Sequence, residues 1–371
     1  MAKLSQRTKM YLSIGLSAVF MYLTIYKPSL SAWLSGRIGI GEAFFGYPRF
    51  NVAELGTVLR STQWGQISIA GVIFFGSLVV RAWRWQLILN PLVRMNFWQV
   101  FGVMNIGYMA NNVLPLRLGE VYKAQVIYQL SGLSRTEAFG TIVVERLVDL
   151  IYMVPFIGLA IMLYPMPEAF QIGGIIASVG AFALCGFCVW LGVDHDRAMH
   201  WTRKVLSVLP ESVAEKSGNG IDKFTSGLGV LGRRELFWGL TISSIILWIM
   251  YGLMVYLVLD SLGMIAGVPL IESNLIGAVL VILFITTFGF VVPGAPGAVG
   301  TYHGVAVLGL SLFKVPGDQA VGFALLLHAL NYIPLTALGW AYFWKYGLSF
   351  RKSSEAGAVI AEENQSITPA Q

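Results

Sequence analysis

The sequence predicts an all-α integral membrane protein. Of its 371 residues, 56% are hydrophobic and only 12% are charged, and the mean hydropathy is +0.70. A soluble domain of this size would need more polar surface to cover its core. Several apolar runs also reach the ~20 residues that a membrane-spanning helix requires. We therefore expect one polytopic membrane domain over residues 1–346 and a disordered cytoplasmic tail over 347–371.

Uninterrupted apolar segments predict about six full transmembrane helices, at 10–26, 66–89, 138–164, 172–192, 238–259 and 319–344. The first segment follows Lys3, Arg7 and Lys9 and has no A-x-A cleavage site, so we expect a retained helix with a cytoplasmic N-terminus. Basic residues after the second segment, in the 194–237 loop and after the last segment place these regions and the C-terminus on the same side. The expected location is the cell (inner or plasma) membrane.

An aromatic and basic cluster lies near the end of the second segment. It comprises Arg81, Trp83, Arg84 and Trp85. Tryptophan and arginine are enriched where helices leave the membrane. We therefore interpret this cluster as an interfacial anchor.

Other polar features do not indicate a nucleic-acid, redox or metal site. The net charge is +6, but the basic residues flank the membrane segments and form no single basic face. Cys185 and Cys188 lie within an apolar helix, where small residues favour helix packing and no accessible thiolate is expected. The four histidines do not occur at metal-ligand spacing. We expect neither a metal nor a cofactor.

Two further apolar stretches, 97–130 and 274–313, are interrupted by proline. Their arms of ~13–17 residues would reach only ~20–25 Å as helices, which is short for a full crossing. We predict re-entrant helical hairpins that enter from opposite faces, each followed by a full span. This order is the outline of an inverted repeat, and interrupted segments at matching positions indicate a transporter site. Ordinary helices kinked by proline and glycine are the alternative.

The first break lies within "NNVLPLRLGEVYKAQ", and its predicted structural residues are Asn112, Pro115 and Gly119. Because proline ends one helix and can begin the next, we expect a half-helix from about Leu116. Its free N–H groups and positive dipole end would then lie inside the membrane. One polar stripe follows at three-residue spacing, formed by Arg117, Glu120 and Lys123. This combination suits a phosphate.

The next span carries a second polar group in "VVERLVDL". Glu145 and Asp149 share a helix face, and Arg146 lies three residues before Asp149. Ionisable residues inside a membrane usually face the bundle interior or a wet cavity. With the first stripe they comprise three cations and three acids, so either cargo binding or mutual pairing explains them.

The second break, "VVPGAPGAVGTYHG", contains the predicted structural residues Pro293, Pro296, Gly297 and Gly300. Proline and glycine interrupt the helix and let the backbone approach a ligand closely. We expect a second half-helix from about Ala298, with Tyr302 and His303 as its polar side chains. Asn331 and His328 on the last span are expected to face them.

These motifs carry a resemblance. "LPLRLGEVYKA", then "GLS" with "VVERLVD", then "VPGAPGAVGTYHG" resemble the lysylphosphatidylglycerol synthase transmembrane-region family, over residues 10–345. The resemblance implies a flippase-like membrane domain that moves lipids, such as aminoacylated phosphatidylglycerol, between leaflets. It maps Arg117, Gly119, Glu120, Glu145, Arg146, Asp149, Pro293 and Gly297 onto the family's motif positions.

The chain departs from the family pattern at the second break. The family often has Gly-Gly where Ala295, Pro296 and Gly297 stand here, and an acid near His303 that this chain lacks. A carboxylate role in that hairpin is therefore not expected. No soluble synthase domain follows the last span, so we expect a stand-alone member that does not make the lipid it moves.

The predicted function is a lipid transporter that is not an enzyme. A head-group phosphate would contact Arg117 and the two half-helix N-termini. The other predicted substrate-binding residues are Glu120, Lys123, Glu145, Arg146, Asp149, Tyr302, His303 and Asn331. The expected partners are membrane lipids and not nucleic acid; a homo-oligomer and a separate lipid-modifying enzyme stay open. The alternative is an integral-membrane enzyme acting on lipid head groups or polyprenyl-linked sugars, and a membrane scaffold is a third interpretation.

Overall fold

The computed structural model describes residues 6–114, 118–164, 168–193, 225–291 and 294–348. This part of the chain is helical, apart from loops and one isolated antiparallel bridge between Tyr26 and Pro48. Five of its helices are long and apolar enough, by length and composition, to cross a membrane. They are α5 (Trp64–Leu89), α8 (Arg135–Leu163), α9 (Glu168–Val193), α12 (Phe237–Ser261) and α17 (Gly317–Lys345). The protein is thus an all-helical multi-span membrane protein, and five of the predicted segments are confirmed as long apolar helices.

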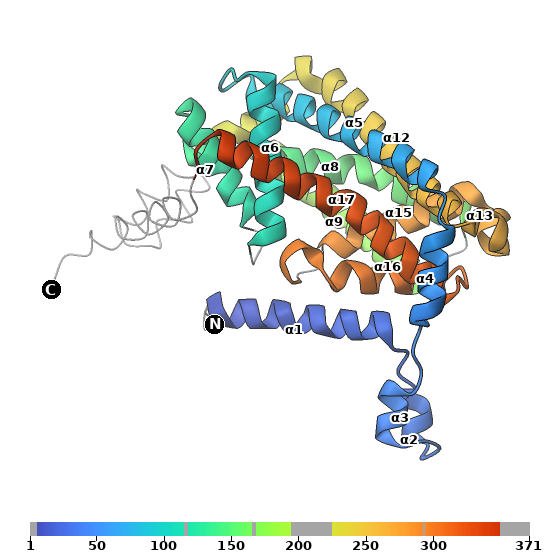
Figure 1. Cartoon of the computed structure of the whole chain (residues 1–371). Coiled ribbons are helices and arrows are strands. Elements are labelled where there is room, and N and C mark those ends of the chain that lie inside the picture. Colours follow the sequence, from blue (N-terminus) through green and yellow to red (C-terminus); the bar gives the residue numbers. More distant parts are fainter. Residues whose placement is uncertain (1–5, 115–117, 165–167, 194–224, 292–293, 349–371) are drawn as a thin grey trace, which may run out of the picture.

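The first predicted segment, 10–26, is a helix that is not among these five. It corresponds to α1 (Gln6–Ile25). The apolar part of this helix, Ile14–Ile25, is shorter than the 18 residues of the shortest of the five spans. The helix begins with the polar sequence Gln-Arg-Thr-Lys, so fewer of its 20 residues are apolar. In Figure 1, α1 lies along one edge of the bundle beside α16 (Thr301–Ser311).

Both proline-containing stretches are divided into two short helices, as predicted. The first stretch forms α6 (Phe97–Val113) and α7 (Gly119–Ser131), and the second forms α15 (Leu275–Val291) and α16. The members of each pair pack against each other. Helices of 11 to 17 residues extend only ~16–26 Å, at 1.5 Å per residue.

The predicted start of the second half-helix is wrong by a few residues. α16 begins at Thr301 and not near Ala298, because the backbone between the two helices has positive φ at Gly297 (66°), Ala298 (56°) and Gly300 (89°). These conformations form a short 3₁₀ turn, η4 (Pro296–Ala298), and a bend before the helix can begin. The predicted start near Leu116 lies outside the described residues.

The short elements lie at the ends of the bundle. They are α2 (Leu30–Leu34), α3 (Ile40–Phe45), α4 (Val52–Ser61), η2 (Gly229–Gly232), η3 (Arg234–Leu236), α13 (Met264–Gly267) and α14 (Pro269–Glu272). Figure 1 shows α2 and α3 projecting from the bundle, whereas α4 packs on α17. Asp318 at the start of α17 accepts a hydrogen bond of 2.7 Å from the Asn51 backbone N–H, which fixes the beginning of α4. The predicted tail lies outside the described residues from position 349 onward.

The interfacial anchor predicted for the end of α5 is wrong for two of its residues. Arg84 and Trp85 are both 0% exposed, because α5 packs along α12 and against α6 and α8. Figure 1 shows α5 and α12 side by side. The buried arginine therefore lies inside the helix bundle, where it needs partners.

Candidate functional site

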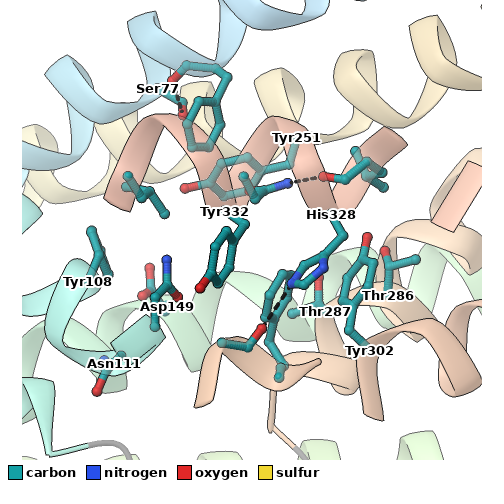
Figure 2. Close-up of a pocket in the computed structure, with 18 of the residues that line it drawn as sticks. Ser77, Tyr108, Asn111, Asp149, Tyr251, Thr286, Thr287, Tyr302, His328 and Tyr332 are labelled. Carbon is teal, nitrogen blue, oxygen red and sulfur yellow. Dashed lines mark hydrogen bonds between the residues drawn. The ribbon is translucent and has the colours of Figure 1, made fainter. Parts of the chain in front are cut away.

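A cavity of about 610 Å³ lies inside the helix bundle. It is lined by residues of α5, α6, α7, α8, α12, α15, α16, α17 and the second break. One part of its wall is apolar, with Phe74, Leu78, Met153, Trp248, Met254, Val255, Leu283, Phe290, Leu327 and Leu335. In Figure 2, Tyr108, Asn111 and Asp149 lie at one end, Tyr302, Thr286 and Thr287 lie at the other, and His328 and Tyr332 lie between them. The cavity thus combines polar ends with an apolar wall.

Both helix breaks line this cavity and approach each other there. Asn111, Asn112 and Leu114 come from the first break, and residues 294–298 come from the second. A Cβ atom placed on Gly297 would lie 3.5 Å from the Asn112 carbonyl oxygen and would collide with the Tyr332 ring. Since Gly297 also has φ of +66°, only glycine fits this point of contact. Sequence segments almost 200 positions apart therefore meet at one place beside the cavity.

The first break is tightly packed at the start of α7. The Asn111 side-chain oxygen accepts a hydrogen bond of 2.8 Å from the Gly119 backbone N–H, which satisfies one free donor at the helix N-terminus. A Cβ atom on Gly119 would collide with the Gly107 carbonyl oxygen. Asn112 donates to the Thr336 hydroxyl of α17 at 2.8 Å. These contacts fix the first break against the neighbouring helices.

A network of ion pairs lies beside the first break. Lys123 Nζ lies 2.6 Å from Glu145 Oε2, and these side chains are 2% and 0% exposed. Arg146 contacts Glu120 at 2.9 Å and Asp149 at 3.3 Å. Asp149 also pairs with the buried Arg84. The network links α5, α7 and α8, and it satisfies charges that would be costly to bury alone.

Arg81 lies beside this network but, unlike Arg84, Lys123 and Arg146, it does not pair with any of its carboxylates. Its Nη1 donates to the Tyr108 hydroxyl at 2.7 Å, and its guanidinium lies 5.4 Å and 5.6 Å from the ring centroids of Tyr108 and Tyr251. Among the described residues it forms no ion pair, and its Nε is buried without a hydrogen-bond partner. Arginine has five N–H donors in a planar fork that matches phosphate and carboxylate oxygens. Because Arg81 lines the cavity, its guanidinium can receive an anion there.

The other polar wall is aromatic and neutral. His328 Nε2 lies 2.9 Å from the Gly297 carbonyl oxygen, and the His328 ring stacks on Tyr302 with centroids 4.9 Å apart. His303 meets His328 edge to face at 4.7 Å, and its Nδ1 accepts from the Gly300 backbone N–H at 3.4 Å. The expectation that His328 faces Tyr302 and His303 is confirmed. Asn331 also lines the cavity, and its amide donates to the Leu327 carbonyl.

The predicted site residues fall into three groups. The cavity is lined by Asn112, Glu120, Arg146, Asp149, Pro296, Gly297, Tyr302 and Asn331. Behind this lining the structure packs Gly119, Lys123, Glu145, Gly300 and His303. Pro115, Arg117 and Pro293 lie outside the described residues.

Arg81 and Arg84 were not among the predicted site residues. The sequence does contain an indication of their position. The two arginines are three residues apart, so they share one helix face, and they lie inside the apolar 66–89 segment instead of following it. Tyr108 and Tyr251, which contact Arg81, lie in apolar helices and give no comparable signal.

The described residues contain no group of three or more His, Cys, Asp or Glu side chains that could hold a metal ion. Cys185 and Cys188 are buried against Leu147 from α8, and their thiols are free. The packing role predicted for this pair is therefore confirmed.

Comparison with known proteins identifies relatives over most of the chain. A UPF0104 membrane protein of Methanothermobacter thermautotrophicus is 29% identical over 286 residues, which cover 75% of this chain and 82% of the relative. A second UPF0104 membrane protein, from Methanocaldococcus jannaschii, is 23% identical over 296 residues, with 76% and 85% covered. Glycosyltransferase AglD of Haloferax volcanii is 24% identical over 311 residues, which cover 75% of this chain but only 48% of AglD. No solved structure matches the chain significantly.

The family assignment follows from the same comparison. Residues 12–339 match the family described as "Lysylphosphatidylglycerol synthase TM region", and this range includes every residue that lines the cavity. The resemblance noted in the sequence is thereby confirmed. The chain is a member of the lysylphosphatidylglycerol synthase TM region family.

Proposed function

We propose that this protein is a lipid transporter, and not an enzyme, which moves the head group of a phospholipid between membrane leaflets through the central cavity. The observation that carries the proposal is Arg81, a guanidinium that lines the cavity and has no carboxylate partner among the described residues. Its free N–H donors suit a phosphate. The apolar wall of the cavity suits the glycerol backbone and the beginning of the acyl chains.

The arrangement of the helices supports a transport mechanism. In this proposal α6–α7 and α15–α16 are re-entrant hairpins that enter from opposite faces, and each precedes a long helix, α8 or α17. The two sets form an inverted repeat, and rocking of one set against the other exposes the cavity to each side in turn. Both chain termini are cytoplasmic, and the protein lies in the cell (inner or plasma) membrane. Membrane lipids are its partners; a homo-oligomer and a separate lipid-modifying enzyme remain further candidates.

Leaflet transfer in proteoliposomes tests the proposal. Purified protein is reconstituted with acyl-labelled phosphatidylglycerol, and loss of inner-leaflet protection from a membrane-impermeant quencher is followed over time. We expect transfer that depends on the protein and falls at least tenfold in Arg81→Gln, because the amide retains polarity but loses the charge and the fork. The same assay applies to Arg117→Ala, since Arg117 stays a predicted second phosphate ligand.

Arg60→Gln is the matched control for this experiment. Arg60 is exposed on α4 and does not line the cavity, so the same chemical change there should leave transfer unaltered. Wild-type transfer by a folded Arg81→Gln protein would contradict the phosphate role of Arg81.

A second candidate function is an integral-membrane enzyme acting on lipid head groups or polyprenyl-linked sugars. It is favoured by the relative whose printed name is glycosyltransferase AglD, although this chain spans about half the length of that relative. Against it, Glu120, Glu145 and Asp149 are all engaged in ion pairs, which leaves no free carboxylate in this group for acid–base chemistry. Conversion of a labelled membrane lipid to a new species by the purified protein would favour the enzyme.

A further inference from the structure

We propose that the cavity selects phospholipids whose head group carries one net negative charge and uncharged hydroxyl groups, and that it discriminates against aminoacylated lipids with a cationic head group. The inference rests on the proposed function, since it names the substrate class of the same cavity. It runs against the cargo that the family description suggests, and it follows from charges and hydrogen bonds of this chain.

The first argument is the charge balance at the charged end of the cavity. Four cations gather there in the described part of the chain: Arg81, Arg84, Lys123 and Arg146. Three carboxylates face them: Glu120, Glu145 and Asp149. Among these described residues one positive charge is therefore in excess, and it is carried by Arg81. A phosphodiester neutralises this charge, whereas a lysyl head group with two ammonium groups and one phosphate adds a further net positive charge.

The second argument is that every carboxylate in this group already has a cationic partner. Glu120 accepts from Arg146 at 2.9 Å, and Glu145 accepts from Lys123 at 2.6 Å. Asp149 accepts from Arg84 and from Arg146. An incoming ammonium group would therefore either add a further cation to a cluster that already has one in excess, or displace one of these cations and leave it buried without a partner. A cationic head group therefore meets a cost that an anionic one does not.

The third argument concerns the neutral wall at the second break. Because a carbonyl oxygen only accepts hydrogen bonds, His328 Nε2 donates to Gly297 and the His328 Nδ1 is left as an acceptor. Asn331 and the hydroxyl-bearing Tyr302 and Tyr332 line the same part of the cavity. Neutral acceptors and donors of this kind pair with hydroxyl groups without the cost of burying a charge. The wall suits the hydroxyls of a glycerol or sugar head group.

The test compares three lipids with identical labelled acyl chains in the same proteoliposomes. Phosphatidylglycerol is anionic and hydroxylated, phosphatidylmethanol is anionic without hydroxyls, and lysylphosphatidylglycerol is cationic. We expect phosphatidylglycerol to be transferred at least tenfold faster than the lysyl lipid and about threefold faster than phosphatidylmethanol. These comparisons need only the wild-type protein, so they do not depend on the folding of any variant.

Two variants assign the selectivity to its residues. Arg81→Gln should bring the ratio between phosphatidylglycerol and the lysyl lipid towards one, because the excess charge is gone. His328→Phe keeps a ring for stacking on Tyr302 but removes the Nδ1 acceptor, so it should abolish the preference over phosphatidylmethanol and leave the charge selectivity intact.

The outcomes separate this inference from the proposed function. Transfer of the lysyl lipid as fast as phosphatidylglycerol would overturn the charge selectivity while leaving lipid transport established. Equal transfer of phosphatidylglycerol and phosphatidylmethanol would overturn the role of the hydroxyl groups. Absence of transfer for all three lipids, by folded protein, would overturn the proposed function and this inference with it.

Discussion

Lys123 and Glu145 show how a charged residue can occupy the interior of this protein without contacting cargo. Their side chains are almost fully buried and lie 2.6 Å apart, and the ammonium group also lies 3.6 Å from the ring centroid of Trp85. Neither residue lines the cavity. Removing two charges from water has a desolvation cost that offsets most of the Coulomb attraction between them. If one partner is lost, the other charge stays buried without compensation, so each residue depends strongly on the other. We interpret this pair as support for the cavity wall.

Replacing Lys123 tests whether the pair has this supporting role. Lys123→Met should lower the free energy of unfolding by about 3–5 kcal/mol, because it leaves Glu145 charged and buried without its main partner. The double variant Lys123→Met with Glu145→Gln should regain most of that stability, because neither charge then remains. Denaturant unfolding of the detergent-solubilised protein measures both. A Lys123→Met protein that keeps full stability but loses lipid transfer would instead place Lys123 at the cargo.

The contact between α6 and α7 depends on glycine at one position. Gly119 begins α7 where its backbone lies against Gly107 and Asn111 of α6, so an added methyl group has no space. Gly119→Ala should therefore separate the two helices and destabilise the protein by about 1–3 kcal/mol, the range for overpacking a well-packed site. A shifted unfolding midpoint in detergent is the expected result.

Gly158→Ala is the matched control for this helix contact. Gly158 lies within α8 and an added Cβ would meet nothing within 4 Å. Alanine there should be neutral or slightly stabilising, since alanine exceeds glycine in helix propensity by about 1 kcal/mol. Equal destabilisation by both substitutions would show that tight packing at Gly119 is not the cause.

The helices and their breaks were largely predictable from the sequence, whereas two arginines at the charged end of the cavity, Arg81 and Arg84, were not. The breaks follow from local chemistry, because proline and glycine in an apolar segment interrupt a helix wherever it packs. The position of Arg81 and Arg84 depends on the packing of α5 against α12, which brings Tyr251 and Ser244 to them. A pattern of basic and aromatic residues near a helix end fits an interfacial anchor equally well. Only the tertiary structure separates these interpretations.

At the scale of the whole molecule, the two helix breaks and the cavity that they line are the part that the proposed transport cycle would open and close. α1 supports the second break from outside: the Ser17 hydroxyl accepts a hydrogen bond of 2.5 Å from the Ala295 backbone N–H. The first break is joined to α17 through Asn112 and Thr336. Each break is therefore held by a helix from elsewhere in the chain, so in the proposed transport cycle a movement of these helices would move the breaks with them.

Cysteine accessibility tests whether the cavity alternates between the two sides of the membrane. Asn331→Cys places a thiol in the cavity, in a background where Cys185→Ser and Cys188→Ser remove the two native thiols. Serine keeps a donor for the Leu147 carbonyl, which the Cys185 thiol contacts at 3.7 Å. If the helices rock around a central site, a membrane-impermeant maleimide should label Cys at position 331 from either side of sealed vesicles. Val72→Cys is the control, since Val72 is 72% exposed on the outside of α5, where lipid should shield it from the reagent. Labelling at position 331 from one side only, with transport-competent protein, would rule out alternating access and leave a fixed cavity open to a single leaflet.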